Sequence, residues 1–478
     1  MGRTHPLSIA SMRYTDAPES GSRMPEPTVA NDSNPRHLPP ILLADATWFG
    51  TLAAVRDLGS RGVPVTLASD AWLAPARASR YVSRSLPCPP TTEAEALLEW
   101  LLRFGRANPG HVLYPTSDNL AWLIAANEGT LAAWFRLFTP AIEALVQLLD
   151  KECMGRAALA AGLDVPDAWY PQDVAEVERL ARTLRYPVFV KPRAHVLARS
   201  RGGAGKGVRV DGPGSLPAVW AAFRAGTTHH PEVLRRSPMA DRPIIQACLQ
   251  AEERVYTVDG FVDGEGALVG ALACEKILQV PRKSGPGVCF DEVPVDPAVA
   301  AGLERLCRAV GFRGVFDAEF LVADGRRKLI DFNPRFYNHM AFEVDRGLPL
   351  PWMAYQAALG KDAAGGTAPV AAAAAAGASG RIYVHHSLTA LLLAFQALAG
   401  AMAAEQQASV RRWIRNHRGH ITDPALDRRD RLPGLMDLAM QAANLVRHPR
   451  AFFRDLLAGG GSAGADGGAS EETHGGRP

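Results

Sequence analysis

Acidic and amide side chains alternate along residues 314–335, a stretch with the pattern of a β-hairpin whose turn is Asp324-Gly325. Residues two apart in a strand share a face. The hairpin would therefore gather one polar set on a single face: Asp317, Glu319, Asp331, Asn333 and Arg335. The other face would be apolar, and it would carry Phe316, Ala318, Phe320, Ile330 and Phe332.

Carboxylates gathered on one face repel one another unless a cation lies among them. Oxygen ligands of this kind suit magnesium, which keeps some waters and shares phosphate oxygens. We therefore predict a metal site formed by Asp317, Glu319, Asp331 and Asn333, with Arg335 binding a phosphate on the metal. The alternative is a solvated hairpin face that holds ordinary ion pairs.

A lysine ends an apolar strand, and a glycine-rich loop follows it. Residues 188–191 read Val-Phe-Val-Lys, and residues 202–207 read Gly-Gly-Ala-Gly-Lys-Gly. A buried ammonium needs an anion, and the backbone N–H groups of such a loop can surround phosphates. The chain has only seven Lys among its 52 basic residues, so a retained Lys indicates a site that wants a compact ammonium. We predict that the loop of residues 202–207 is a mobile lid that orders when phosphate binds, and that the phosphate is bound by Lys191, Gly203, Gly205 and Lys206.

Other patterns are less specific. The strand Pro-Ile-Ile-Gln-Ala-Cys-Leu (243–249) is expected at a sheet edge, where its backbone could contact an adenine, and an acid a few residues later could accept hydrogen bonds from a ribose. Lys276, Arg282 and Lys283 surround a Gly/Pro-containing loop that either binds an anionic substrate or transferred phosphate, or is solvated. Surface roles are expected for three His without partners at metal spacing: His195, His229 and His230. No GxSxG surrounds Ser117-Asp118, so a nucleophile pair is not indicated.

Composition excludes several classes of protein. The 52 basic and 49 acidic residues give a net charge of +3, which does not favour nucleic-acid binding. None of the six Cys forms a CxxC pair, which argues against zinc and disulfides and favours the cytoplasm. Residues 387–404 are the one membrane candidate, but they are expected to form a buried or interfacial helix, so membrane association is not expected.

The order of strands and helices predicts several parts. Alternating strands and helices over residues 40–140 predict a doubly wound parallel sheet, without the GxGxxG of a dinucleotide fold. The chemistry lies in residues 145–360, where both α/β and α+β patterns occur. The remaining parts are a disordered leader (1–39), a linker (363–380), a helical appendage (381–457) and a disordered tail (458–478).

From about residue 41 to 360 the sequence resembles the ATP-grasp superfamily, in its carbamoyl-phosphate-synthase-like and ATP-dependent carboligase branch. The motifs follow the family order: a helix-borne Asp150-Lys151, the strand Lys, the glycine-rich loop, the hinge strand, and the final DxE…DxNxR hairpin. Two short segments, SRYVSRSLPCP and YPTSDN, also look like that branch. The resemblance implies a pre-ATP-grasp domain followed by a two-lobed ATP-grasp fold.

The resemblance also implies roles. ATP phosphates would be contacted by Lys151 and Lys191, adenine by Gln246 and Leu249, and ribose by Glu253. Magnesium, with Mn²⁺ as a substitute, would be held by Glu319, Asp331 and Asn333, and phosphate or acyl phosphate by the catalytic Arg335, with Lys276 and Arg282 nearby. Two departures from the family are Gln246, where many relatives carry Glu, and Asp317, which leaves open whether Asp317 or Glu319 is the main metal ligand.

The activity implied is that of a carboxylate–amine ligase, which activates a small carboxylate as an acyl phosphate with Mg-ATP and transfers it to an amine. Bicarbonate-using carboxylase or carbamoyl-phosphate chemistry is one alternative, and a non-catalytic nucleotide-binding protein is another. A homodimer is compatible with the sequence, which identifies neither substrate.

Overall fold

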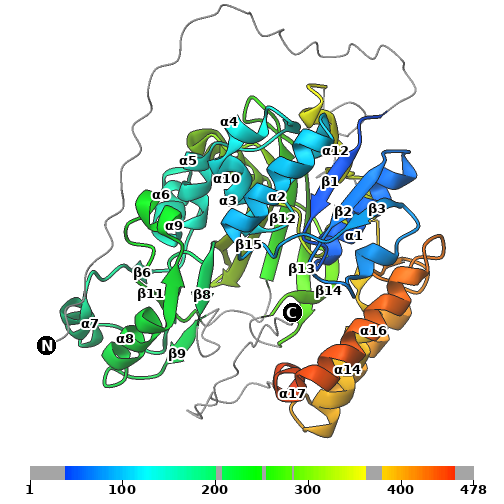
Figure 1. Cartoon of the computed structure of the whole chain (residues 1–478). Coiled ribbons are helices and arrows are strands. Elements are labelled where there is room, and N and C mark those ends of the chain that lie inside the picture. The colour runs from blue at the N-terminus through cyan, green and yellow to red at the C-terminus, as the bar shows by residue number, and fades with distance from the viewer. Residues whose placement is uncertain (1–37, 201–206, 250–254, 282–284, 362–378, 458–478) are drawn as a thin grey trace, which may run out of the picture. The chain divides into compact units, whose positions relative to one another are not determined.

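The computed structural model describes residues 38–200, 207–249, 255–281, 285–361 and 379–457. The chain divides into a unit of residues 1–38 and a unit of residues 39–478, and every helix and strand that the structure describes belongs to the second unit (Figure 1). The leader, linker and tail predicted from the sequence lie almost wholly outside the described residues. The domain boundaries therefore stay predictions.

A five-stranded parallel sheet, in the order β3-β2-β1-β4-β5, begins this unit. All four residues of β1 are buried, because helices cover both faces of a doubly wound sheet. The order reverses between β1 and β4, which is where such sheets bind ligands, at the carboxyl ends of the strands. The elements are β1 (Ile41–Ala44), α1 (Phe49–Ser60), β2 (Val65–Ala68), η1 (Pro75–Ala78), β3 (Val82–Leu86), α2 (Ala94–Ala107), β4 (His111–Leu113), α3 (Asp118–Ala126), α4 (Glu128–Leu131) and β5 (Phe135–Leu137).

A break in a predicted helix positions the next elements. The helix expected to carry Asp150-Lys151 is two helices in the structure, α5 (Ile142–Leu149) and α6 (Lys151–Ala160). Asp150 separates them, since its carboxylate accepts hydrogen bonds from the backbone N–H groups of Glu152 and Cys153 and so caps α6. The break places Lys151 at the first position of a new helix.

A four-stranded sheet in the order β6-β11-β7-β9 carries the strand lysine. Trp220 is fully buried between this sheet and its helices. The strand β11 lies between β6 and β7, so the expectation that it is an edge strand was wrong. This part contains β6 (Ala168–Trp169), α7 (Val174–Ala181), β7 (Val188–Lys191), β9 (Val208–Val210), α8 (Leu216–Gly226) and β11 (Ile244–Ala247), next to a two-stranded sheet of β8 (Ala198–Ser200) and β10 (Thr227–His229) that precedes α9 (Pro231–Arg236).

A seven-stranded sheet in the order β16-β15-β12-β13-β14-β17-β18 carries the acidic hairpin. One face packs on α6 and α10 through an apolar core that includes Leu303, Phe316 and Phe332. The elements are β12 (Val255–Val262), β13 (Leu268–Gln279), β14 (Gly287–Val293), α10 (Pro297–Val310), β15 (Gly314–Ala323), β16 (Arg326–Asn333), α11 (Met340–Asp345) and α12 (Leu350–Ala358).

The hairpin forms as predicted, with one irregularity. Asp317 lies opposite Asn333, and Glu319 lies opposite Asp331, but Phe320 pairs with Leu329. Ile330 is therefore an extra residue in β16, a β-bulge. Leu329 takes the place in the core that the sequence pattern gave to Ile330, which is only half-buried.

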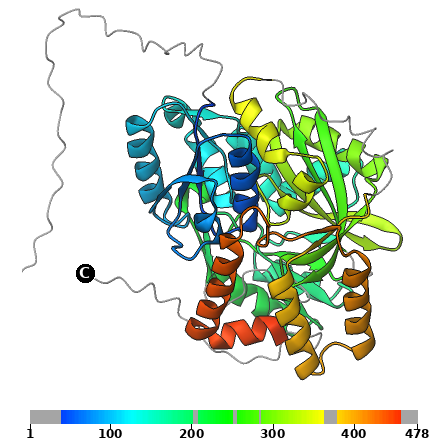
Figure 2. The ribbon, with the colours of Figure 1, turned by 90° about the vertical axis from the view of Figure 1, so that its right-hand side faces the viewer.

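The C-terminal elements extend the large sheet and add four helices. They are β17 (Ile382–Val384), α14 (His386–Leu398), α15 (Ala404–Asn416), β18 (Ile421–Thr422), α16 (Leu432–Arg447) and α17 (Pro449–Leu457). The four helices, gold to red, lie together at the bottom of Figure 2. Arg56 of α1 holds this part, because its guanidinium donates to the carboxylate of Asp430 (3.0 Å) and to the carbonyl of Pro424 (2.7 Å). No helix in the described ranges, α14 included, is long and apolar enough to cross a membrane.

Candidate functional site

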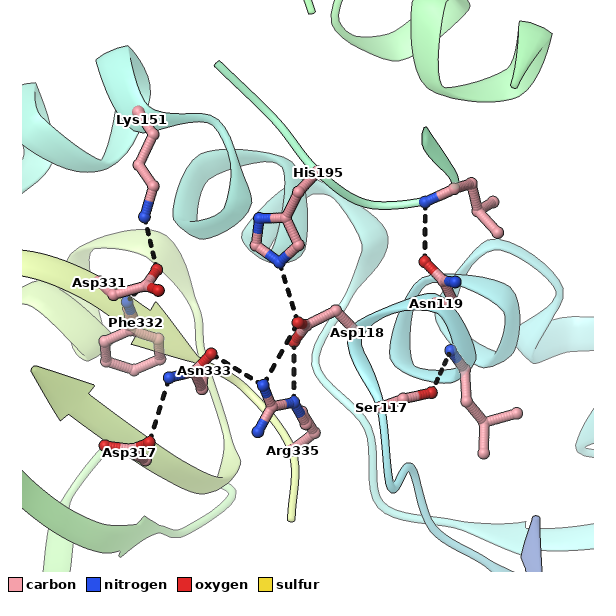
Figure 3. Close-up of polar contacts among 12 residues, drawn as sticks. Ser117, Asp118, Asn119, Lys151, His195, Asp317, Asp331, Phe332, Asn333 and Arg335 are labelled. Atoms are coloured by element: carbon pink, nitrogen blue, oxygen red, sulfur yellow. Dashed lines mark hydrogen bonds and ion pairs between the residues drawn. The ribbon is translucent and has the colours of Figure 1, made fainter. Parts of the chain in front are cut away.

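Lys151 faces the end of the hairpin. Its Nζ lies 2.5 Å from Oδ1 of Asp331 and 3.1 Å from the carbonyl oxygen of Ile330 (Figure 3). The bulge at Ile330 therefore supplies one of the two acceptors of this ammonium. Burial by itself would raise the pKa of Asp331, but the positive charges of Lys151 and His195 lower it, so the carboxylate is ionised.

Glu319 and Asp331 face one another across the two strands, and each pairs with its own lysine. The Nζ of Lys276, on β13, lies 3.2 Å from Oε1 of Glu319. Lys276 is 7% exposed, and although burial disfavours its charge, Glu319 and Asp317 raise its pKa. Two ionised carboxylates are thus kept side by side by two ammonium groups.

A chain of hydrogen bonds leads from Asp317 to the first sheet (Figure 3). Asn333 donates through Nδ2 to Oδ2 of Asp317 (3.1 Å), and the guanidinium of Arg335 donates to Oδ1 of Asn333 (2.9 Å). Arg335 also donates through Nε to Oδ1 of Asp118 (3.1 Å), and His195 lies 3.0 Å from the other oxygen of Asp118. The guanidinium of Arg335 is therefore held at a fixed angle by one partner at the end of β16 and one at the start of α3.

Sequence reasoning considered Asp118 only as part of a nucleophile pair, and it expected a surface role for His195. The side chain of His195 is 40% exposed, as expected, but it also pairs with Asp118. Asp118 follows β4, at the carboxyl edge of the doubly wound sheet, which is the signal that could have found it. Although burial acts against its charge, Arg335 and His195 hold the pKa of Asp118 far below its usual range. It is a permanent anion that orients the guanidinium of Arg335 and contacts the ring of His195.

Asp317 differs from the two acids beside it. It is 4% exposed, and its Oδ1 has no hydrogen-bond partner among the described residues. Burial and the neighbouring charge of Asp259 raise its pKa well above the usual range. The side chains of Glu319 and Asp331 are 23% and 35% exposed. Of the oxygen ligands predicted, these two are open to a ligand, and Asp317 lies behind Asn333.

Lys191 has a neutral hydrogen-bond partner. Its Nζ lies 2.7 Å from Oε1 of Gln246 on the adjacent strand β11. Burial and repulsion by Lys151 lower its pKa to about 8. Two ammonium groups that repel one another, with a neutral amide as the hydrogen-bond partner of one, form a site for an added anion.

Gly207, the last residue of the glycine-rich loop, lies against this lysine. Gly207 has a φ of 127°, and a Cβ at this position would lie 2.8 Å from Cγ of Lys191. Glycine is therefore required here for both reasons. Leu249 is half-buried two residues after β11. The remaining predicted residues lie outside the described part of the chain: Gly203, Gly205, Lys206, Glu253 and Arg282.

Replacing Asp118 by Asn tests the role of its charge. The change keeps the shape but removes the anion that holds Arg335 and His195, so we expect turnover to fall by about ten-fold or more, as when one positioned polar contact is lost. Steady-state kinetics and thermal melting would measure this. Ser117→Ala, which removes the N-cap of α3 but keeps the carboxylate of Asp118, is the matched control, and an equal loss of activity in both would contradict this role.

Part of this sequence is similar to known proteins. No family model matches the chain. The carbamoyl phosphate synthase large chain of Kocuria rhizophila is 26% identical over 198 residues, which is 40% of this chain and 16% of that one. The large chain of Methanothrix thermoacetophila is 25% identical over 207 residues, which is 42% of this chain and 17% of the relative. This chain thus matches well under a quarter of the length of these relatives.

The fold is shared with solved structures. Biotin carboxylase from Campylobacter jejuni, solved with an ATP analogue, matches with a TM-score of 0.52 and 16% identity, over 69% of this chain and 71% of the other. N5-carboxyaminoimidazole synthetase from Staphylococcus aureus matches with a TM-score of 0.50 and 13% identity, over 68% and 78%. The chain has the ATP-grasp fold. In this ATP-grasp fold Lys191 and Gln246 come from the four-stranded sheet, and the acidic hairpin comes from the seven-stranded one.

Proposed function

We propose that the chain is an ATP-dependent ligase that activates a carboxylate as an acyl phosphate and transfers it to an amine. The observation that carries this proposal is the pairing of two carboxylates with two ammonium groups. Glu319 pairs with Lys276, and Asp331 pairs with Lys151. The side chains of Lys151 and Lys191 repel one another, and a triphosphate would satisfy both. The ATP-grasp fold is compatible with this activity.

We propose Glu319, Asp331 and Asn333 as the groups that hold Mg²⁺, with Asp317 orienting Asn333 from behind. The donor set fits a hard cation, because it consists of two exposed carboxylates and an amide oxygen. The lysine partners of the two acids would turn to phosphate oxygens when metal and nucleotide bind. Magnesium, when bound, would neutralise charge on the phosphates.

Each of the other side chains would have a distinct role. Lys151 and Lys191 would bind the phosphates, and Gln246 would orient Lys191 through its 2.7 Å hydrogen bond. Arg335, held by Asp118 and Asn333, would face the transferred phosphoryl group. A carboxylate oxygen would attack the γ-phosphorus, the bond to ADP would break, and ADP would leave with the electron pair. An amine would then attack the acyl carbon, lose a proton, and release phosphate.

Bicarbonate chemistry is the second candidate, since the curated relatives are carbamoyl phosphate synthases and biotin carboxylase shares the fold. In that case bicarbonate would be the carboxylate that is phosphorylated. Lys276 and Arg335 would serve either substrate, so the residues described do not separate the two reactions.

An assay of ADP release distinguishes the two reactions. It would be screened over amino acids and small carboxylates in buffer freed of bicarbonate. We expect ADP release to require one carboxylate and one amine, with the amide identified by mass spectrometry. ADP release that depends on bicarbonate would establish the carboxylase reading instead. The absence of turnover with every pair, together with intact ATP binding, would indicate a non-catalytic protein.

A further inference from the structure

The helix α16 buries polar side chains and exposes apolar ones. Its inner face carries Asp437 and Gln441, both almost fully buried, while Leu435 is 63% exposed and Val446 is 80% exposed. At 100° per residue the exposed apolar side chains form one stripe opposite that polar face. This outer stripe consists of Leu432, Leu435, Leu438, Ala439, Ala442 and Val446. An amphipathic helix of a globular protein normally has the reverse arrangement.

The inner face is anchored by polar contacts, so the orientation of α16 is specified. Asp437 accepts hydrogen bonds from Ser387 (2.7 Å) and from Gln441 (2.9 Å). Ser387 also lies 3.1 Å from Nδ1 of His385. Rolling the helix to bury its leucines would break this network and expose its partners, at a cost for each lost bond. The stripe is therefore displayed on a fixed support.

Further apolar side chains lie where α14, α16 and α17 meet. Leu398, at the end of α14, is 82% exposed, and α14 contacts α17 through the hydrogen bond from Gln396 to the carbonyl of Leu456. Phe453 and Leu457 of α17 are also exposed. Exposed apolar side chains are thus present on both α16 and α17, which contact one another.

Arginine surrounds this apolar surface. Residues 379–457 contain eleven Arg, no Lys and six Asp or Glu, although the whole chain carries a charge of only +3. Exposed Arg447 and Arg450 join α16 to α17, and within the described ranges no carboxylate lies within ion-pair distance of either. On the neighbouring α15, the exposed Arg411, Arg412 and Arg415 line a hollow of about 510 Å³.

We propose that the outer stripe of α16, together with the exposed face of α17, docks on a membrane surface that carries anionic lipid headgroups. Leucine, valine and phenylalanine would enter the headgroup boundary, and the arginines beside them would bind lipid phosphates, as in helices that lie in the interface plane. Residues 458–478 contain no Leu, Ile, Val, Met, Phe, Tyr or Trp that could cover the stripe. A second copy would bring two arginine-rich faces together, so charge complementarity favours the anionic surface.

Co-sedimentation of the full chain with vesicles tests this site. We expect binding to vesicles of phosphatidylcholine with phosphatidylglycerol, weak binding to phosphatidylcholine alone, and release by salt. Leu435→Ser with Val446→Ser should reduce the bound fraction by roughly ten-fold or more, since two exposed side chains lose their burial in lipid. Leu159→Ser, at a leucine of α6 that is 58% exposed, is the matched control and should bind as the wild type does.

The charges are tested separately. Arg447→Gln with Arg450→Gln should weaken binding to anionic vesicles and flatten its salt dependence, whereas Arg103→Gln with Arg106→Gln on α2 should do neither. Leu435, Val446 and the substituted arginines are exposed, so thermal melting of these variants should be unchanged. Wild-type protein that ignores anionic vesicles, or stripe variants that bind as well as wild type, would overturn the proposal. So would a dimer in light scattering that the stripe substitutions dissociate, because a second copy would then cover this face.

Discussion

Replacing Asp331 by Ala is expected to abolish ATP turnover while leaving the fold intact. Asp331 lies at the end of β16, its side chain is about a third exposed, and its only side-chain cation is Lys151 at 2.5 Å among the described residues. The substitution deletes one of the two partly exposed carboxylates. It also frees the ammonium of Lys151 to compete with the metal for the phosphates. Loss of a group aimed at developing charge typically lowers turnover by ~10²-fold or more.

The measurement is ADP release at saturating Mg²⁺, together with thermal melting. Asp164→Ala is the matched control, because Asp164 also pairs with a basic side chain, that of Arg326 at the far end of the same hairpin. Each variant loses the carboxylate of one ion pair that involves β16, but only Asp331 faces the proposed metal. An Asp331→Ala enzyme with wild-type ATP hydrolysis would rule out its role as a metal ligand.

The sequence predicted what depends on local periodicity. Alternation along residues 314–335 and the Asp324-Gly325 turn predicted a hairpin that brings the acidic residues together on one face. Counted back from that turn without a bulge, Glu319 would pair with Ile330, and the bulge shifts the register so that Glu319 lies opposite Asp331. The same alternation failed at Ile330, since a bulge changes the count by one residue and nothing in the side chains signals it. That bulge gives Lys151 its second acceptor.

Contacts between distant segments were beyond local patterns. Asp118 and Arg335 are far apart in the chain, and Lys191 and Gln246 meet only because β7 and β11 are neighbours in a sheet. Asp150 looked like part of a helix, yet its carboxylate ends one helix and starts the next. These errors arose where a polar side chain bonds to a backbone N–H group or pairs with another side chain. Residue type and spacing alone do not reveal such partners.

Lys191→Met is the second decisive change, and burial makes its effect differ between the free and nucleotide-bound protein. The ammonium is largely buried, repelled by Lys151 and bonded to a neutral amide, so its pKa falls from 10.5 to about 8. A lysine whose folded pKa is lowered destabilises the folded state while it is charged. We therefore expect the variant without nucleotide to melt at or above the wild-type temperature near pH 7.

The sign of the pH dependence follows from the same shift. Below pH 8 the lysine is charged in both states, and the wild type carries the full penalty. Between about pH 8 and 10.5 the folded protein releases a proton that the unfolded chain keeps, so wild-type stability rises relative to the variant. The advantage of Lys191→Met should therefore shrink over this window, as chemical denaturation at several pH values would measure.

Nucleotide should reverse the ranking of the two proteins. ATP would supply the anion that Lys191 lacks, so the variant should lose affinity or turnover by roughly ten-fold or more, which is ~1.4 kcal/mol per decade. Its melting temperature should then rise less than that of the wild type when Mg-ATP is added. Lys328→Met, at a half-buried lysine of β16 near the far end of the hairpin, is the matched control and should keep the full rise. A Lys191→Met protein that melts much lower without nucleotide, yet shows the full ATP-induced rise, would make Lys191 a structural residue and remove one support of the proposed phosphate site.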